Sequence, residues 1–81
     1  MGRFYFHLKE GDELVPDEHG TELPDVAAAT REALLTAREL LANAIKAGKP
    51  KIYDALVIAD DTGRTVEVLP FATILPEPLK K

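Results

Sequence analysis

The first segment of the chain alternates apolar and polar side chains. Between residues 3 and 9 every second position is apolar, and two of the three apolar side chains are phenylalanine. A period of two with aromatic residues predicts a strand that buries one face. The side chains expected in the core are Phe4, Phe6 and Leu8. Tyr5 and His7 then lie on the opposite face.

Two short segments follow, residues 13–16 and 21–23, and they flank the sequence Asp-Glu-His-Gly at residues 17–20. An Asp followed three positions later by Gly is typical of a type I turn, with Gly20 at positive φ. We therefore expect the two segments to pair with each other as a short hairpin. Pro16, which has no N–H, confines its strand to a sheet edge.

The longest periodic segment is rich in alanine and leucine and predicts one helix from Val26 to about Ala47. Asp25 supplies an N-cap, Gly48 a C-terminal stop, and Pro50 excludes further helix. On a helical wheel one arc of about 160° is apolar. Its residues are Val26, Ala29, Ala33, Leu34, Ala37, Leu40, Leu41, Ala44 and Ile45. Because the centre of the arc is mostly alanine, we expect the helix to lie close to a flat sheet.

Two further strands are expected after the helix. Residues 54–60 are almost continuously apolar between two Asp residues, which predicts a central strand over Ala55–Ala59. The sequence Asp-Thr-Gly-Arg at residues 61–64 favours a turn, and the alternating residues 65–69 complete a hairpin. Two alternatives stay open for the central strand. Either Leu56 and Ile58 face the helix, or its three small residues at positions 55, 57 and 59 do.

These elements predict an α+β fold, with a small antiparallel sheet of three to four strands and the long helix packed on one face. The order along the chain is roughly β-β-α-β-β. The predicted helix is longer than a typical strand, so it has to cross the sheet diagonally or overhang it. We expect residues 1–75 to form a single domain and residues 76–81, rich in proline and lysine, to form a flexible tail.

The composition narrows the class of protein. The chain has 81 residues, 10 Lys+Arg, 14 Asp+Glu, a formal net charge of −4 and no cysteine. This length allows one small domain, and the lack of cysteine excludes a disulfide scaffold or a cysteine-based zinc or redox site. No apolar run reaches the roughly 18 residues of a membrane span, and no secretory signal is evident. We therefore expect a cytoplasmic protein with no membrane partner.

The sequence lacks the motifs that carry catalysis or cofactor binding. It has no glycine-rich phosphate loop and no Ser or Cys nucleophile. Asp60 and Asp61 lie at a hairpin turn, where Asp side chains serve backbone geometry. With a net charge of −4, the few lysines form no footprint for nucleic acid. We therefore expect no enzyme activity, no cofactor, no metal and no nucleic-acid partner.

The second face of the predicted sheet carries apolar side chains that a single helix cannot cover. We expect this face to include Tyr5, His7, Val57 and Leu69, since Leu69 is out of phase with Val66 and Val68 of its strand. An exposed apolar face favours a protein-interaction module. A homodimer is the commonest such assembly, and a different protein partner, which the sequence does not identify, is the other form.

Two alternatives to this interface stay open. In one, the C-terminal segment with Phe71, Ile74 and Leu75 folds back over the second face. In the other, the face of His7 and Tyr5, or the acidic turn around His19, binds a small ligand or a metal. The carboxylates near His19 are those of Asp12, Glu13, Asp17 and Glu18.

Three features in a fixed order resemble a known family. They are the aromatic first strand ending in His7-Leu8, the Asp-Glu-x-Gly turn at residues 17–20, and an alanine-rich helix with a Glu32-Ala33 step. In this combination the chain resembles a family of short proteins from alphaproteobacterial soil bacteria that is known only as a domain of unknown function. The resemblance extends to about Phe71. It implies the same fold and this kind of source, and it brings no activity, cofactor or catalytic residue.

Overall fold

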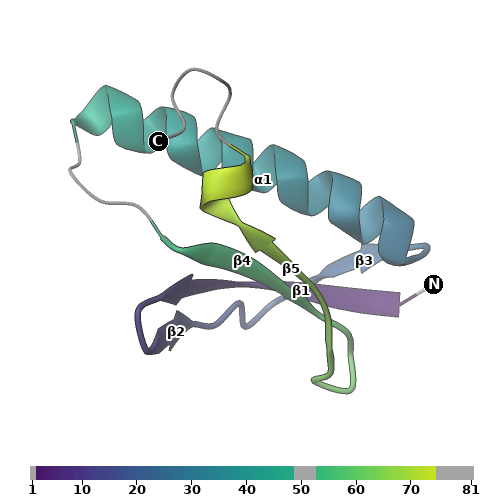
Figure 1. Cartoon of the computed structure of the whole chain (residues 1–81). Coiled ribbons are helices and arrows are strands. Elements are labelled where there is room, and N and C mark those ends of the chain that lie inside the picture. Colours follow the sequence, from purple (N-terminus) through teal and green to yellow (C-terminus); the bar gives the residue numbers. More distant parts are fainter. Residues whose placement is uncertain (1, 49–52, 75–81) are drawn as a thin grey trace.

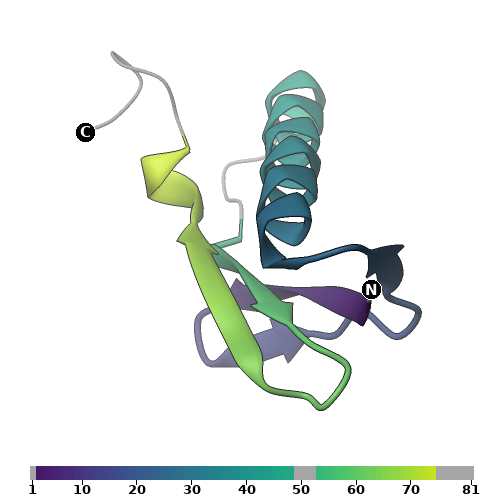
Figure 2. The ribbon, with the colours of Figure 1, turned by 90° about the vertical axis from the view of Figure 1, so that its right-hand side faces the viewer.

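The computed structural model describes residues 2–48 and 53–74 and contains one long helix and five strands. The elements, in chain order, are β1 (Gly2–Glu10), β2 (Glu13–Val15), β3 (Thr21–Leu23), α1 (Val26–Ala47), β4 (Ala55–Ala59), β5 (Thr65–Pro70) and the short 3-10 helix η1 (Phe71–Thr73). In Figures 1 and 2 α1 lies along one side of the sheet. The expected α+β fold is therefore confirmed, with five strands in place of three to four. The predicted tail, residues 76–81, lies outside the described residues.

Strand β1 is the centre of the sheet and pairs with three other strands. It pairs antiparallel with β4 along residues 5–9, and β4 pairs antiparallel with β5. On its other side β1 pairs with β2 at one end and with β3 at the other. The strand over Ala55–Ala59 is therefore central, as its continuous apolar sequence predicts.

The predicted hairpin between residues 13–16 and 21–23 is wrong. Both β2 and β3 run antiparallel to β1, so they run in the same direction as each other and form two halves of one interrupted edge strand. The interruption is residues 16–20, which we call the Asp17 turn. It begins at Pro16, which has no N–H to donate to a sheet ladder. The turn nevertheless contains Gly20 at φ +73°, as predicted.

Helix α1 has the predicted bounds and caps. The Asp25 carboxylate accepts a hydrogen bond from the N–H of Ala28 at 2.8 Å, and the helix ends at Gly48 in the left-handed conformation. The buried residues form a single stripe, Ala29, Ala33, Ala37 and Leu41. The ends of the predicted arc are wrong, because Val26 is 43% and Ile45 67% exposed. Ile45 lies on the last turn of α1, which begins after Leu41 and carries no buried side chain, as expected of a helix that overhangs its sheet.

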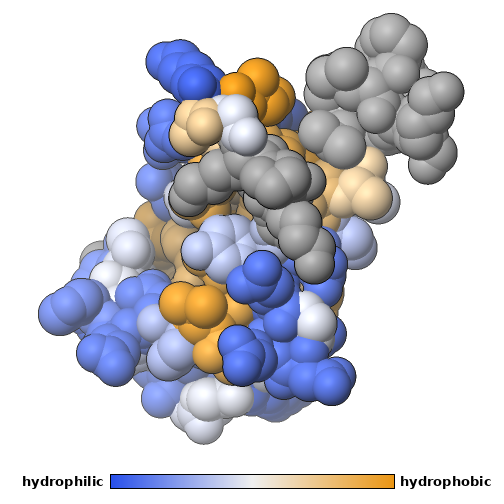
Figure 3. Space-filling model, turned by 90° about the vertical axis from the view of Figure 1, so that its left-hand side faces the viewer, coloured by the Kyte–Doolittle hydropathy of each residue, from blue (hydrophilic) through white to orange (hydrophobic). Residues whose placement is uncertain are grey.

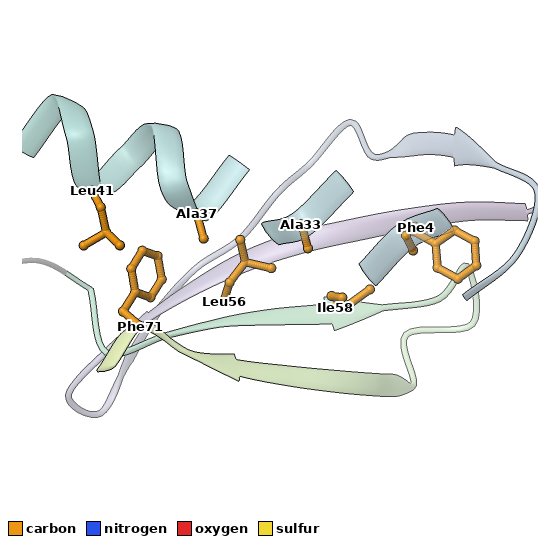
Figure 4. Close-up of a cluster of buried hydrophobic side chains, with 8 residues drawn as sticks. Phe4, Ala33, Ala37, Leu41, Leu56, Ile58 and Phe71 are labelled. Carbon is orange, nitrogen blue, oxygen red and sulfur yellow. The ribbon is translucent and has the colours of Figure 1, made fainter. Parts of the chain in front are cut away.

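The core lies between α1 and the sheet and contains Leu56 and Ile58 of β4, both fully buried. Phe4 of β1 is in the same cluster, which resolves the two alternatives for β4 in favour of Leu56 and Ile58. In Figure 4 the ring of Phe71, from η1, lies beside Leu41 of α1. Phe71 and the partly buried Ile74 therefore pack on the helix side of the sheet. They do not cover its second face, and Leu75 lies outside the described residues.

A β-bulge in β5 changes which of its side chains face the core. The pairing of β4 with β5 shifts by one residue between Ile58 and Ala59. A bulge adds one unpaired residue to a strand and reverses the alternation of the faces beyond it. As a result Val66 and Leu69 both pack against the core cluster, although they are three positions apart.

Candidate functional site

The face of the sheet turned away from α1 is defined by alternation and register. Phe4 of β1 is buried on the helix side. Side chains alternate along a strand, so Tyr5 and His7 point to the other side. Val57 is paired with His7, Val68 with Val57, and Leu14 with Lys9. Paired residues share a face. We call this surface, with Tyr5, His7, Lys9, Leu14, Val57 and Val68, the open face.

The open face exposes apolar side chains to water. Leu14 is 50% and Val68 is 46% exposed, and Tyr5, His7 and Val57 are half-buried. Figures 1 and 2 show no helix on this side of the described sheet. Figure 3 faces the end of the molecule where β1 turns into β2, and there apolar side chains lie among hydrophilic ones at the surface. On the open face itself, His7, Val57 and Val68 form one row across three strands.

Three of the four expected interface residues lie on the open face, and Leu69 does not. Leu69 is paired with Leu56, which is fully buried under α1, and it packs against the core. Its neighbour Val68 takes the place on the open face. The expectation for Leu69 failed because the bulge places Val66 and Leu69 on one side of β5 and leaves Val68 on the other.

The Asp17 turn closes the gap between β2 and β3 at the edge of β1. The N–H of Phe6 lies in this gap and donates to Oδ2 of Asp17 at 3.1 Å. Oδ1 of Asp17 accepts from the N–H groups of His19 and Gly20, each at 3.2 Å. A side-chain carboxylate thus replaces the backbone acceptor that a continuous edge strand supplies, and it also shapes the turn.

His7 binds the backbone of the same turn from the open face. The N–H of Asp17 donates to Nδ1 of His7 at 2.9 Å. Because Nδ1 accepts, the proton of the neutral ring lies on Nε2. The rings of His7 and Tyr5 stack with their centroids 6.3 Å apart and their planes 16° from parallel. One hydrogen bond therefore joins His7 to the turn, with the imidazole nitrogen as acceptor and the backbone N–H of Asp17 as donor.

The environment of the Asp17 carboxylate shifts its pKa. Partial burial raises this pKa. Hydrogen bonds from the N–H groups of Phe6, Gly20 and His19, together with the nearby His7 ring, lower it by more than burial raises it. The net effect is a pKa below the ordinary value of 3.8. The carboxylate is thus held in its charged form by the backbone that it organises.

The Asp17 turn packs tightly on β1 at Gly20. A Cβ atom at Gly20 would lie 2.8 Å from Cγ of Arg3 and 2.8 Å from Cε2 of Tyr5. The guanidinium of Arg3 donates to the carbonyl oxygen of His19 at 2.8 Å. The structure thus brings together the face of His7 and Tyr5 and the acidic turn, which the sequence presented as separate candidate sites.

Asp60, which the sequence also presented for consideration, serves a turn. Oδ1 of Asp60 accepts from the hydroxyl and the N–H of Thr62 and from the N–H of Arg64. The hydroxyl of Thr62 is the main cause that lowers the pKa of Asp60. Asp60 therefore organises the β4–β5 hairpin, in agreement with its expected backbone role.

Within residues 2–48 and 53–74 no three His, Cys, Asp or Glu residues are placed to hold a metal ion together. Nδ1 of His7 is already engaged by Asp17. No helix in the described part of the chain combines the length and the apolar character that crossing a membrane requires. Lys49, Lys51 and the lysines at 80 and 81 lie outside the described residues.

Fold and site define a class of small α+β protein, in which one helix covers one face of an antiparallel sheet and the other face stays open. The chain belongs to a family described as a domain of unknown function (DUF6894), whose model matches residues 3–72. The comparisons with curated proteins and with solved structures gave no match. The bacterial source implied by the resemblance stays a prediction.

Three residues of this region were not expected from the sequence. Leu14 and Val68 reach the open face. The register of their hairpins would have indicated this, since Leu14 is opposite Lys9 and Val68 is opposite Val57. The role of Asp17 as an acceptor for β1 has no such signal. It depends on β2 and β3 sharing one partner strand, which local sequence does not encode.

Proposed function

We propose that this protein is a non-enzymatic, cytoplasmic interaction module that forms a homodimer through the open face. The observation that carries the proposal is the exposure of Leu14 and Val68 on the same side of the sheet as Tyr5, His7 and Val57. Burying such surface is favourable by about 25 cal/mol per Å². A core of this size is marginal on its own, so association adds stability that the single chain lacks.

The charges of the open face support a second copy as the occupant. Lys9 of the open face and Arg3, at another odd position of β1, both donate to backbone carbonyl oxygens of their own chain. Nζ of Lys9 donates to Gly11 and the guanidinium of Arg3 to His19, at 2.7 and 2.8 Å. The row His7, Val57 and Val68 between them carries no fixed charge. A second copy can therefore meet this row without opposing like charges, which a two-fold interface has to avoid.

The β5 edge supports association by the face over association by the edge. The N–H of Phe71 donates to the carbonyl oxygen of Asp54, toward β4. Because N–H groups alternate in direction along a strand, the position of Pro70, which has no N–H, is on the outer side. The carbonyl oxygen of Pro70 already accepts from the hydroxyl of Thr73 at 2.7 Å. In this half of β5, only the outward backbone N–H and C=O of Val68 are therefore left to pair with an added strand.

The opposite edge is also unsuited to strand addition. It consists of β2 and β3, each only three residues long. The Asp17 turn separates them, and its carboxylate occupies the N–H of Phe6. A short, interrupted edge gives an incoming strand no continuous ladder. The open face is therefore the surface that we assign to the partner.

The test is the mass of the protein in solution with and without a charge on the open face. Light scattering at tens of micromolar should give about twice the chain mass of 8.9 kDa. Val68→Glu should raise the dissociation constant at least tenfold, which corresponds to about 1.4 kcal/mol, because it places a charge in a desolvated interface. Tyr5 is a poorer choice for this test, because it packs on Gly20 and a change there disturbs the Asp17 turn.

The matched control is Leu35→Glu. Leu35 is a comparably exposed apolar residue, at 54%, but it lies on α1 away from the sheet. This variant should remain a dimer. A monomeric wild type at that concentration, or equal dissociation constants for Val68→Glu and Leu35→Glu, would overturn the proposal.

A further inference from the structure

The bond between His7 and the Asp17 turn has a chemical property that its neighbours lack. Its acceptor, Nδ1, is a titratable atom and its donor is a backbone N–H. The geometry points to an acid-sensitive latch: neutral His7 holds the Asp17 turn against β1, and protonation of His7 releases it. The inference goes beyond dimerisation and holds whether or not the dimer forms.

Protonation removes the acceptor because both nitrogens of an imidazolium carry hydrogen. The two nitrogens lie 2.9 Å apart, so an Nδ1–H would point at the N–H of Asp17. Two donors cannot share this position, so either the ring or the turn has to move. Histidine is the side chain whose charge ordinarily changes between about pH 5 and 8. The Asp17 turn also contains His19, so the two histidines have to be distinguished by experiment.

The charged and titratable groups around His7 come from two elements. The Asp17 turn contributes the Asp17 carboxylate, which attracts a cationic ring, and the exposed side chains of Glu18 and His19. Strand β1 contributes the stacked ring of Tyr5 and two cations at alternate positions, Arg3 and Lys9. The β4 residue opposite His7 is Val57, which does not titrate. The imidazolium thus exchanges its bond to the N–H for attraction to the carboxylate.

This exchange has a consequence for the edge of β1. The Asp17 carboxylate bonds the N–H of Phe6 through Oδ2, and the turn is shaped by bonds to Oδ1. A carboxylate drawn toward the imidazolium leaves one or more of these donors without its acceptor. We expect the N–H of Phe6 to be the first affected, because the bond that holds it crosses from the turn to the strand. The latch thereby links the charge of His7 to the continuity of the sheet edge.

The experiment is a pH titration followed by NMR on the 81-residue chain. At neutral pH, long-range proton–nitrogen spectra should show Nδ1 of His7 without hydrogen and Nε2 with it. As His7 titrates, the amide signals of Asp17 and Phe6 should move with the same midpoint. Hydrogen exchange at these two amides, corrected for the intrinsic rate, should accelerate at least tenfold.

Two variants separate His7 from the other histidine. His19→Asn leaves His7 as the only histidine in the chain and should keep the full response. His7→Asn keeps an oxygen acceptor near the position of Nδ1 but does not titrate, so the response should vanish in it. If His7→Asn fails to fold, the titration of His19→Asn decides alone. A hydrogen on Nδ1 at neutral pH, or amides of Asp17 and Phe6 that stay unchanged while His7 titrates, would refute the latch.

Discussion

Three alanines of α1, at positions 29, 33 and 37, are fully buried against the sheet. Their small side chains allow the helix to lie close to Leu56 and Ile58, which are also fully buried. Interiors are packed densely, so a larger side chain at such a position finds no free volume. The space between helix and sheet is therefore set by the small methyl side chains of three residues.

Replacing the middle of this stripe should destabilise the protein. We expect Ala37→Leu to lower the free energy of unfolding by roughly 1–3 kcal/mol, since overpacking forces the helix away from the sheet. Leu35→Ala, on the exposed side of α1, should change it by less than about 0.5 kcal/mol. Urea denaturation measures both. Equal stability of Ala37→Leu and the wild type would show that the helix is rotated from the position described.

Gly20 allows a second prediction for a single residue. A Cβ there meets Arg3 and Tyr5, and the residue is at φ +73°, whereas Gly11 has φ +61° and nothing within 4 Å of a Cβ. Both Gly→Ala changes cost the roughly 1–2 kcal/mol of a left-handed residue. Gly20→Ala should cost about 1–3 kcal/mol more, because of overpacking. Equal melting temperatures for the two variants would contradict the tight packing of the Asp17 turn.

At the scale of elements, what the sequence could predict depended on how local the signal is. The bounds of α1 follow from its caps at Asp25 and Gly48, and β4 and β5 follow from an apolar run and a turn. The interrupted edge strand did not follow, because the signals of residues 17–20 describe a turn but not which strands it joins. The bulge that moved Leu69 into the core is likewise a property of the pairing with β4.

The Asp17 turn gives the fold a dependence on pH that has a definite sign. The pKa of Asp17 is lower in the folded chain than its ordinary 3.8. The charged carboxylate therefore contributes stability above about that pH, and the contribution is lost as the pH falls through the folded-state pKa. Asp17→Asn, which leaves one acceptor oxygen for three N–H donors, should reduce the free energy of unfolding at pH 7 by about 1–3 kcal/mol.

The difference between Asp17→Asn and the wild type should shrink below about pH 4, where the wild-type carboxylate is also becoming neutral. Urea midpoints from pH 7 to about pH 2.5 measure this convergence. Asp12→Asn, an exposed residue of the β1–β2 turn, is the control and should follow the wild type at every pH. A difference that stays constant down to the lowest pH would mean that charge is not what Asp17 contributes.

At the scale of the whole molecule, the two edges of the sheet limit which surfaces of two copies can associate. Pro70 has no N–H at an outward-facing position of β5, two residues after Val68. The missing donor limits edge-to-edge pairing with another copy. Pro70→Val restores that N–H in a backbone conformation, φ −65° and ψ 132°, that valine also adopts. We expect this variant to form light-scattering aggregates on heating, at temperatures where the wild type stays clear.

The control for this prediction is Pro24→Val, the same change at an exposed proline before α1. It adds an N–H at the bend that follows the last residue of β3, outside the strand, and should leave the onset of scattering unchanged. Identical onset temperatures for Pro70→Val and the wild type would show that Pro70 does not guard the edge.

The pairing of β1 with β4 also orders events during synthesis. A ribosome that adds about 5–20 residues per second makes β1, both halves of the edge strand and all of α1 before β4 exists. Until then Phe4 and Phe6 have neither Leu56 nor Ile58 beside them, and the alanine stripe of α1 has no sheet beneath it. Closing β1 onto β4 encloses the whole helix in one loop, and such non-local pairings are slow to form. The aromatic strand of the nascent chain therefore stays without its core partners until β4 has been made.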